Sequence, residues 1–155
     1  ASGEVADVWL AFAAAGCAWI VGVAGNHDLV TAEDVARLGD AAALLDGDTV
    51  EYGGVRFGGV GGVIGDPRRT DRRAEEEFLA LLAAVGKADP QVLVLHEGPP
   101  GARREQYGNP AISATLLDGT AALTVCGHVH WDRPLARLGA GHVVNVDGRV
   151  VVLTR

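Results

Sequence analysis

The sequence predicts an α/β fold, and three features of its pattern support this. Apolar runs of strand length lie at 18–24, 91–95 and 121–126, and segments with helical periodicity separate them. The runs lack the regular polar alternation of a half-exposed strand, which is typical of strands covered on both faces. Helices that alternate with buried strands favour a layered sheet and helix architecture. A length of 155 residues fits a single domain over residues 1–155.

The first quarter of the chain is predicted to contain a helix, a strand and a short helix. Helical spacing of apolar residues predicts the first helix over about 4–15, ended by Gly16: Val5, Val8, Trp9 and Phe12. The apolar run 18–24 follows as a strand. Thr31 and Asp34 have the spacing of a capping box, so a short helix is expected to begin there and to end near Leu38.

The middle of the chain reads as a group of strands followed by a helix. Short strands are expected at 42–45, 49–52 and 55–60, and Gly53-Gly54 between the last two is a suitable hairpin turn. From 71 to 85 the apolar residues line one helical face and charged residues take the other, which predicts an amphipathic helix.

The last third begins with the apolar strand 91–95, which ends on His96. Asn109-Pro110 offers an N-cap and a first-turn proline for a helix to about Leu117, and the strand 121–126 comes next. The tail has strand-like patterns, and we expect it to form a small antiparallel meander from the runs 135–138, 143–146 and 150–153.

Composition narrows the functional classes. The formal net charge is -7, and there is no general basic surface of the kind that nucleic-acid binding requires. The distant cysteines Cys17 and Cys126 fit free thiols in a reducing compartment, so a cytoplasmic location is expected. No apolar run approaches the roughly 20 residues of a membrane-spanning helix, so no membrane association is expected. The chain lacks methionine and opens on a helical pattern, which suggests a missing front end.

Polar clusters stand at the ends of the three apolar strands. They are GNHD (Gly25 to Asp28), the isolated His96, and GHVH (Gly127 to His130). In open α/β sheets ligands bind beyond the carboxyl ends of the strands, so these clusters should converge although they are far apart in the sequence. Packing does not reward polar groups at the end of a buried strand, because each must find a partner or remain in water.

The residue types in these clusters suit metal and proton chemistry. On an extended backbone His128 and His130 would leave the same face, where one metal could take both or two metals could take one each. Asn26 supplies a hard amide oxygen for a divalent ion. His27 would point elsewhere and is better placed as an acid/base group, since imidazole titrates near neutrality. We interpret Asp28 as a residue that braces the loop.

GNHD, the separate histidine and GHVH, in this order on strand ends, resemble the later motifs of the calcineurin-like metallophosphoesterases. The resemblance implies that Asn26, His96 and His128 bind one ion, that His130 binds a second, and that His27 protonates the leaving group. It further implies two divalent ions (Mn, Fe or Zn) and a phosphorylated substrate, either a monoester (phosphatase) or a diester (phosphodiesterase).

The chain departs from the family pattern in its front motifs, because neither DxH nor GDxxD occurs before GNHD. We therefore expect a metallophosphoesterase-like α/β sandwich that is incomplete at its N-terminus and lacks its first strands. Lost strands would leave an exposed sheet edge, open to the missing N-terminal segment or to another copy. Whether this chain is active alone stays open, and two alternatives remain: an inactive scaffold or binding module with the same fold, and a mononuclear zinc protein.

A group of arginines between 68 and 73 has two interpretations. The side chains either attract an anionic substrate or belong to the solvated start of the helix expected at 71–85.

Overall fold

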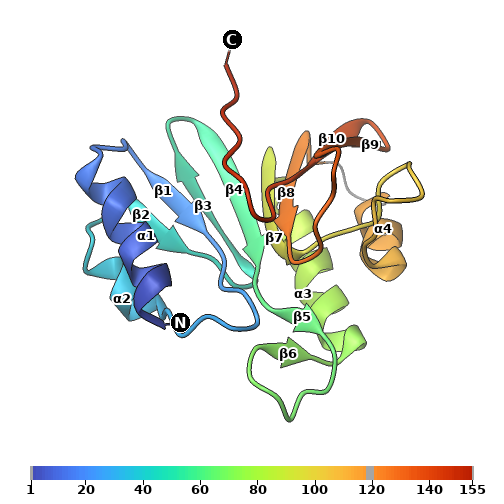
Figure 1. The fold of residues 1–155 in the computed structure, drawn as a ribbon, viewed down its shortest axis with the longest axis horizontal. Helices are drawn as coiled ribbons and strands as arrows, with labels where there is room; N and C mark the ends of the chain where they lie inside the picture. The colour runs from blue at the N-terminus through green and yellow to red at the C-terminus, as the bar shows by residue number, and fades with distance from the viewer. Residues whose placement is uncertain (1, 118–120, 155) are drawn as a thin grey trace.

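The computed structural model describes residues 2–117 and 121–154. The helices of these residues are α1 (Ser2–Ala14), α2 (Ala32–Ala36), α3 (Glu75–Gly86) and α4 (Pro110–Leu117). The strands are β1 (Ile20–Gly22), β2 (Ala42–Leu44), β3 (Asp48–Tyr52), β4 (Val55–Val60), β5 (Val63–Ile64), β6 (Arg72–Arg73), β7 (Val92–Glu97), β8 (Leu123–Gly127), β9 (Leu135–Leu138) and β10 (Gly141–Asn145). Figure 1 shows strands and helices in layers, as expected for an α/β fold.

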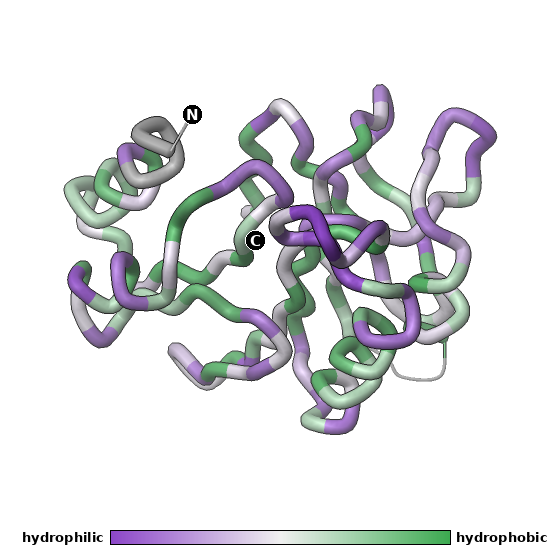
Figure 2. The backbone as a smooth tube through the Cα atoms, turned by 90° about the horizontal axis from the view of Figure 1, so that it is seen from below, coloured by the Kyte–Doolittle hydropathy of each residue, from purple (hydrophilic) through white to green (hydrophobic). Residues whose placement is uncertain are grey.

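The largest sheet has the strand order β3-β4-β7-β8-β10-β9. Its four inner strands run parallel, and the outer strands β3 and β9 are antiparallel to their neighbours. The carboxyl ends of the inner strands therefore meet at one end of the sheet, which lies at the bottom of Figure 1. Seen from below in Figure 2, hydrophilic loops lie around this end.

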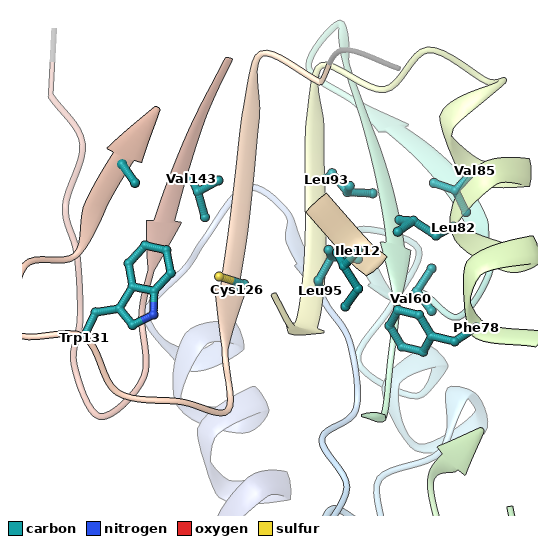
Figure 3. Close-up of a cluster of buried hydrophobic side chains, with 11 residues drawn as sticks. Val60, Phe78, Leu82, Val85, Leu93, Leu95, Ile112, Cys126, Trp131 and Val143 are labelled. Atoms are coloured by element: carbon teal, nitrogen blue, oxygen red, sulfur yellow. The ribbon is translucent and has the colours of Figure 1, made fainter. Parts of the chain in front are cut away.

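A hydrophobic core lies between this sheet and the helices α3 and α4 (Figure 3). Its members are fully or almost fully buried: Val60, Phe78, Leu82, Val85, Leu93, Leu95, Ile112, Cys126, Trp131, Ala136 and Val143. Burial of this apolar surface is the main stabilising contribution to the fold. The core holds the strand ends of β4, β7 and β8 in a fixed relation to one another.

β1 and β2 form a separate parallel pair that packs near β4. A Cβ atom at Gly59 would lie 2.7 Å from Cβ of Leu45 and 2.8 Å from Cγ1 of Val23. The missing side chain at this position therefore permits the close approach of the two sheets. This packing carries the GNHD segment, which follows β1, to the carboxyl end of β4.

Several expectations from local sequence signals are confirmed. Thr31 caps α2 in a full capping box with Asp34. Gly53 and Gly54 turn the β3–β4 hairpin with φ values of 58° and 75°, as a two-residue hairpin turn requires. Asn109 accepts a hydrogen bond from the amide of Ala111 at the start of α4.

No helix in the described part of the chain has both the length and the apolar character needed to cross a bilayer.

The helix expected at 71–85 begins later, at Glu75. Asp71 has a left-handed backbone with φ of 52°, and the next two residues pair with Val63 and Ile64 as β6. The amphipathic pattern was right for the body of the helix. Arg72 and Arg73 lie outside the helix, because they form β6 and pair with β5. The expected start of the helix at residue 71 is therefore wrong.

The expected antiparallel meander in the tail is wrong in two respects. β10 pairs with β9 in antiparallel fashion but joins the main sheet parallel to β8. Residues 150–153 form no strand, and Val150 and Val152 are 84% and 78% exposed. In Figure 1 this segment extends away from the sheet. The first apolar run also differs, since β1 is only partly buried and lies outside the main sheet.

Candidate metal centre

Three residues predicted from strand ends come together in space. Asn26 lies in the turn after β1, His96 lies near the end of β7, and His128 follows β8 directly. Nε2 of His96 is 3.0 Å from Oδ1 of Asn26 and donates to it. The rings of His96 and His128 have centroids 5.1 Å apart and are tilted by 57°. An amide oxygen and two imidazoles thus meet at the carboxyl end of the sheet.

The GNHD turn is shaped so that Asn26 can face His96. The amide of Gly25 donates to Oδ2 of Asp28 at 2.6 Å, which closes the turn and confirms the bracing role expected for Asp28. A Cβ atom at Gly25 would lie only 2.7 Å from Cε1 of His96. Glycine is therefore needed here to admit the imidazole ring, and Asn26 beside it is almost fully buried.

The pKa of His96 is lowered from its ordinary value. Burial is the main cause, because it disfavours the charged imidazolium, and the neighbouring His128 adds repulsion. Nearby carboxylates of Asp28 and Asp147 oppose the shift. A neutral imidazole is the form that binds metals, so the surroundings of His96 favour the form required of a metal ligand.

The backbone of GHVH is not extended, contrary to the expectation from the sequence. His128 has φ of 68°, in the left-handed region, so the alternation that would place His128 and His130 on one face does not apply. The amide of Val129 donates to the carbonyl of Gly127 in the resulting tight turn. The side chain of Asn145, 1% exposed, holds this turn through a 2.8 Å bond to the carbonyl of Val129.

His130 contacts residues of the turn after β10, one of which, Asp147, also acts electrostatically on His96. Nδ1 of His130 donates to the carbonyl of Asp147 at 3.1 Å. Nη2 of Arg149 lies 3.0 Å from Nε2 and 3.3 Å from Nδ1 of the same ring, and it also donates to the carbonyl of Trp131. Within residues 2–117 and 121–154, no three residues of the types His, Cys, Asp and Glu are grouped so that they could hold a metal ion.

His27 lies at the exposed tip of the GNHD turn. Its ring is close enough to His96 to contribute weakly to the lowered pKa of that residue. The structure thus brings His27 beside the cluster of Asn26, His96 and His128, where its ring is open to a ligand or to solvent.

Sequence reasoning missed two residues that shape this region. Glu97 accepts from the amide of Ile64 at 2.7 Å and from Nδ2 of Asn109 at 3.2 Å, which fixes the end of β7 beside His96. A charged residue at the end of an apolar strand was a usable signal for Glu97. Arg149 follows a turn in the tail, and no local pattern connects it to His130.

Comparison with known proteins identifies the family. The family model described as calcineurin-like phosphoesterase matches residues 2–132. The chain belongs to this family. Among solved structures, the crystal structure of TT1561 of Thermus thermophilus is similar with a TM-score of 0.76 at 17% sequence identity, over 94% of this chain and 70% of that chain. A likeness at this identity shows the fold alone. No curated protein matches the sequence.

Members of the calcineurin-like phosphoesterase family generally use divalent metals, and part of the cluster fits such an ion. Two ligand atoms that each lie about 2.1 Å from one ion in tetrahedral or octahedral geometry are about 3.0 to 3.4 Å apart. Oδ1 of Asn26 and Nε2 of His96 have this separation, at 3.0 Å, and binding of an ion by Nε2 would require the ring proton to be on Nδ1 instead. His130 does not fit in its present contacts, because Arg149 lies against its ring nitrogens.

Proposed function

We propose that this chain carries the metal-binding and proton-donating groups of a phosphoesterase that hydrolyses phosphate monoesters or diesters. The convergence of Asn26, His96 and His128 at the carboxyl end of the sheet carries the proposal. These residues would hold one divalent ion. When bound, such ions draw charge from phosphoryl oxygens and lower the pKa of water, which is what phosphoester hydrolysis needs.

His27 would supply the proton for the leaving group. A phosphoester releases an alkoxide or aryloxide oxygen, and this group leaves more easily when an acid protonates it. His27 stands on the turn that carries Asn26, and its ring is exposed, so a bound ester can approach it. Asp28 holds the shape of the turn and keeps His27 adjacent to the metal-binding residues.

A dinuclear centre would require two changes in the surroundings of His130. Its Nε2 would have to exchange Arg149 for an ion, and the second ion would need carboxylate ligands in addition. The DxH and GDxxD motifs of the family would supply such groups, and they do not occur in these 155 residues. We propose that Mn, Fe or Zn occupies the site and that further ligands come from outside this sequence.

Metal uptake tests the proposal most directly. The purified chain is stripped with chelator and titrated with Mn²⁺ or Zn²⁺, and bound metal is measured by elemental analysis and calorimetry. We expect one ion per chain, and we expect Asn26→Ala or His96→Ala to weaken binding at least tenfold, because each removes a ligand. His142→Ala is the matched control, since His142 is exposed on β10. Equal binding by all four proteins would refute the site.

Hydrolysis of phenyl phosphate and bis(phenyl) phosphate separates the ester classes. In metal-loaded protein, His27→Gln should lower kcat by roughly 10²- to 10⁴-fold, as expected for loss of a general acid, and leave metal affinity unchanged. A parallel loss of metal binding would show that His27 is a ligand and not the proton donor.

A second candidate function is a binding or scaffold module that keeps the fold without turnover. The contact of Arg149 with His130 favours it, because a guanidinium at the ring nitrogens opposes a second cation there. This reading predicts one bound ion and no hydrolysis of either ester. A structural mononuclear zinc site predicts in addition that chelation unfolds the chain.

A further inference from the structure

A cationic segment lies at the same end of the sheet as the candidate metal centre. We call it the arginine segment; it comprises residues 63–73, which include β5, β6 and the connection between them. Its arginines are Arg68, Arg69, Arg72 and Arg73. In Figure 1 it projects below the ends of β4 and β7, and it is the hydrophilic loop nearest the viewer in Figure 2.

Two hydrogen bonds fix the base of this segment to the candidate metal centre. The amide of Gly62 donates to the carbonyl of Ala24 at 2.9 Å, directly before GNHD. The amide of Ile64 donates to Oε2 of Glu97 at 2.7 Å, directly after His96. The arginine segment therefore starts next to the two chain segments that carry Asn26 and His96.

Two of the four arginines already have carboxylate partners. Arg73 donates to Oδ2 of Asp46 at 2.6 Å and to the carbonyl of Gly61 at 2.9 Å, with Glu77 3.7 Å away. Arg68 makes an ion pair of 2.8 Å with Asp66. Arg73 thus anchors the segment, and the charge of Arg68 is matched by its neighbour.

The other two arginines have unmatched charge. In the part of the chain that the structure describes, neither Arg69 nor Arg72 has a carboxylate oxygen within 4.0 Å. Both act at longer range on Asp66, whose pKa is lowered mainly by its bond to Arg68. The side chain of Arg72 lies along Gly65, where an added Cβ would meet its Cδ and Nη1 at 3.4 Å.

These side chains border a shallow hollow of about 480 Å³. It is lined by residues 67–73 and by Glu77, whose carboxylate faces Arg73. Arginine is the side chain best suited to bind phosphate oxygens. The hollow is open to solvent, so a phosphate group can enter it.

We propose that Arg69 and Arg72 bind a second phosphate group of the substrate, apart from the phosphoester at the metal centre. The substrate class is then a phosphoester with at least one further phosphate. The inference rests on the proposed function for its account of the substrate. The anion-binding property of the arginine segment stands on its own contacts.

Binding of tripolyphosphate to metal-free protein tests the segment separately from catalysis. Calorimetry in EDTA compares the wild-type chain with Arg69→Gln/Arg72→Gln and with the charge-neutral control Asp66→Asn/Arg68→Gln, which removes both members of an ion pair. We expect the Arg69→Gln/Arg72→Gln variant to bind about tenfold or more weakly, because two charge-assisted bonds are lost, and the control to stay within about twofold. Affinity of the wild-type chain should fall with salt.

Equal binding by wild type and the Arg69→Gln/Arg72→Gln variant would overturn the inference, as would an equally large loss in the Asp66→Asn/Arg68→Gln control. If Arg72→Gln disturbs β6, the exposed Arg69→Gln alone should still weaken binding about threefold or more, and unchanged affinity would count against the proposal. Absence of hydrolysis of both phenyl phosphate and bis(phenyl) phosphate by the metal-loaded wild-type chain would count against the proposed function, while arginine-dependent binding of tripolyphosphate would still support the segment.

Discussion

His96 combines a packing role with the properties of a ligand. Its ring lies against the bare backbone of Gly25, contacts Asn26, and stands beside the ring of His128. Gly25 and Asn26 belong to the turn after β1, and His128 follows β8. The burial that orients the ring of His96 also lowers its pKa. One physical cause therefore both positions the ring and keeps it in the neutral form that can bind a metal.

The lowered pKa of His96 predicts a pH dependence of stability. The unfolded chain binds a proton at His96 near pH 6.5, and the folded chain does so only at lower pH. Stability from the neutral ring is therefore fully present above pH 6.5 and is lost as pH falls through the folded pKa. Urea unfolding in EDTA at pH 7.5, 6.5 and 5.5 should show a smaller decline for His96→Gln than for wild type. Parallel declines would contradict this.

The two cysteines should differ sharply in reactivity. Burial raises the pKa of the Cys126 thiol to about 12, with a bond to Asn145 opposing the shift, so almost none of it is thiolate at pH 8. Cys17 is exposed. We expect a thiol reagent to label one cysteine per native chain at pH 8 and two after denaturation. Cys17→Ser should remove the native reaction, and labelling of Cys126 in that native variant would be inconsistent with its burial.

At the residue scale, the sequence predicted correctly which side chains of the strand ends converge. It did not predict the orientation of His130. His96 and His128 come together because β7 and β8 are parallel neighbours that share a carboxyl end, a rule that sequence order alone can apply. Asn26 follows β1, outside this sheet, and reaches His96 through the packing of the β1–β2 pair against β4. The orientation of His130 depends on a left-handed His128 and on Arg149, which lies 19 residues further along the chain. The local sequence around His130 predicts neither the left-handed backbone of His128 nor the contact with Arg149. The assignment of these residues as metal ligands stays a prediction.

Among the elements, glycine positions set how closely β4 approaches its neighbours. Gly59 faces Leu45 and Val23 with no room for a methyl group. Gly86, at the end of α3, has open space around it: a Cβ atom added there would meet no atom within 4 Å, and its backbone is one that other residues can adopt. The same substitution should therefore have opposite effects at the two positions.

Gly59→Ala should destabilise the chain by about 1 to 3 kcal/mol, because the added methyl overpacks the contact between β4 and the β1–β2 pair. Gly86→Ala should stabilise it by about 0.4 to 1 kcal/mol, because alanine has fewer unfolded conformations to lose. Chemical unfolding of both variants measures these changes. A neutral Gly59→Ala would mean that the two sheets are less closely packed than the distances indicate.

Elements with a local chemical signal were predictable, and those that depend on partners were not. The capping box at Thr31, the Gly53-Gly54 hairpin and the Asn109 cap each have their own residues as cause. β6 has two residues and forms only by pairing with β5. The sequence shows no sign of this pairing, so the helical pattern of the following residues led us to expect the helix to begin before β6. The run 150–153 has strand propensity but no strand beside it.

For the whole molecule, the sequence predicted the layers but not the order of strands. Buried apolar runs and amphipathic helices require an α/β arrangement whatever their neighbours are. That β10 lies between β8 and β9, and that β1 pairs with β2 outside the main sheet, are long-range choices decided by packing. Association of this chain with a further segment or with another copy stays a prediction.

Truncation of the tail tests whether the residues after Val150 contribute to the stability of the fold. Val150, Val152 and Leu153 are between 66% and 84% exposed, so their apolar side chains contribute little buried area. Ending the chain after Val150 keeps Arg149 and its contact with Trp131. We expect the melting temperature to change by no more than about 2 °C, since surface changes are worth about 0.5 kcal/mol. A fall of about 5 °C or more in scanning calorimetry would show that the tail packs against the sheet in solution, and the extended arrangement in Figure 1 would then be wrong.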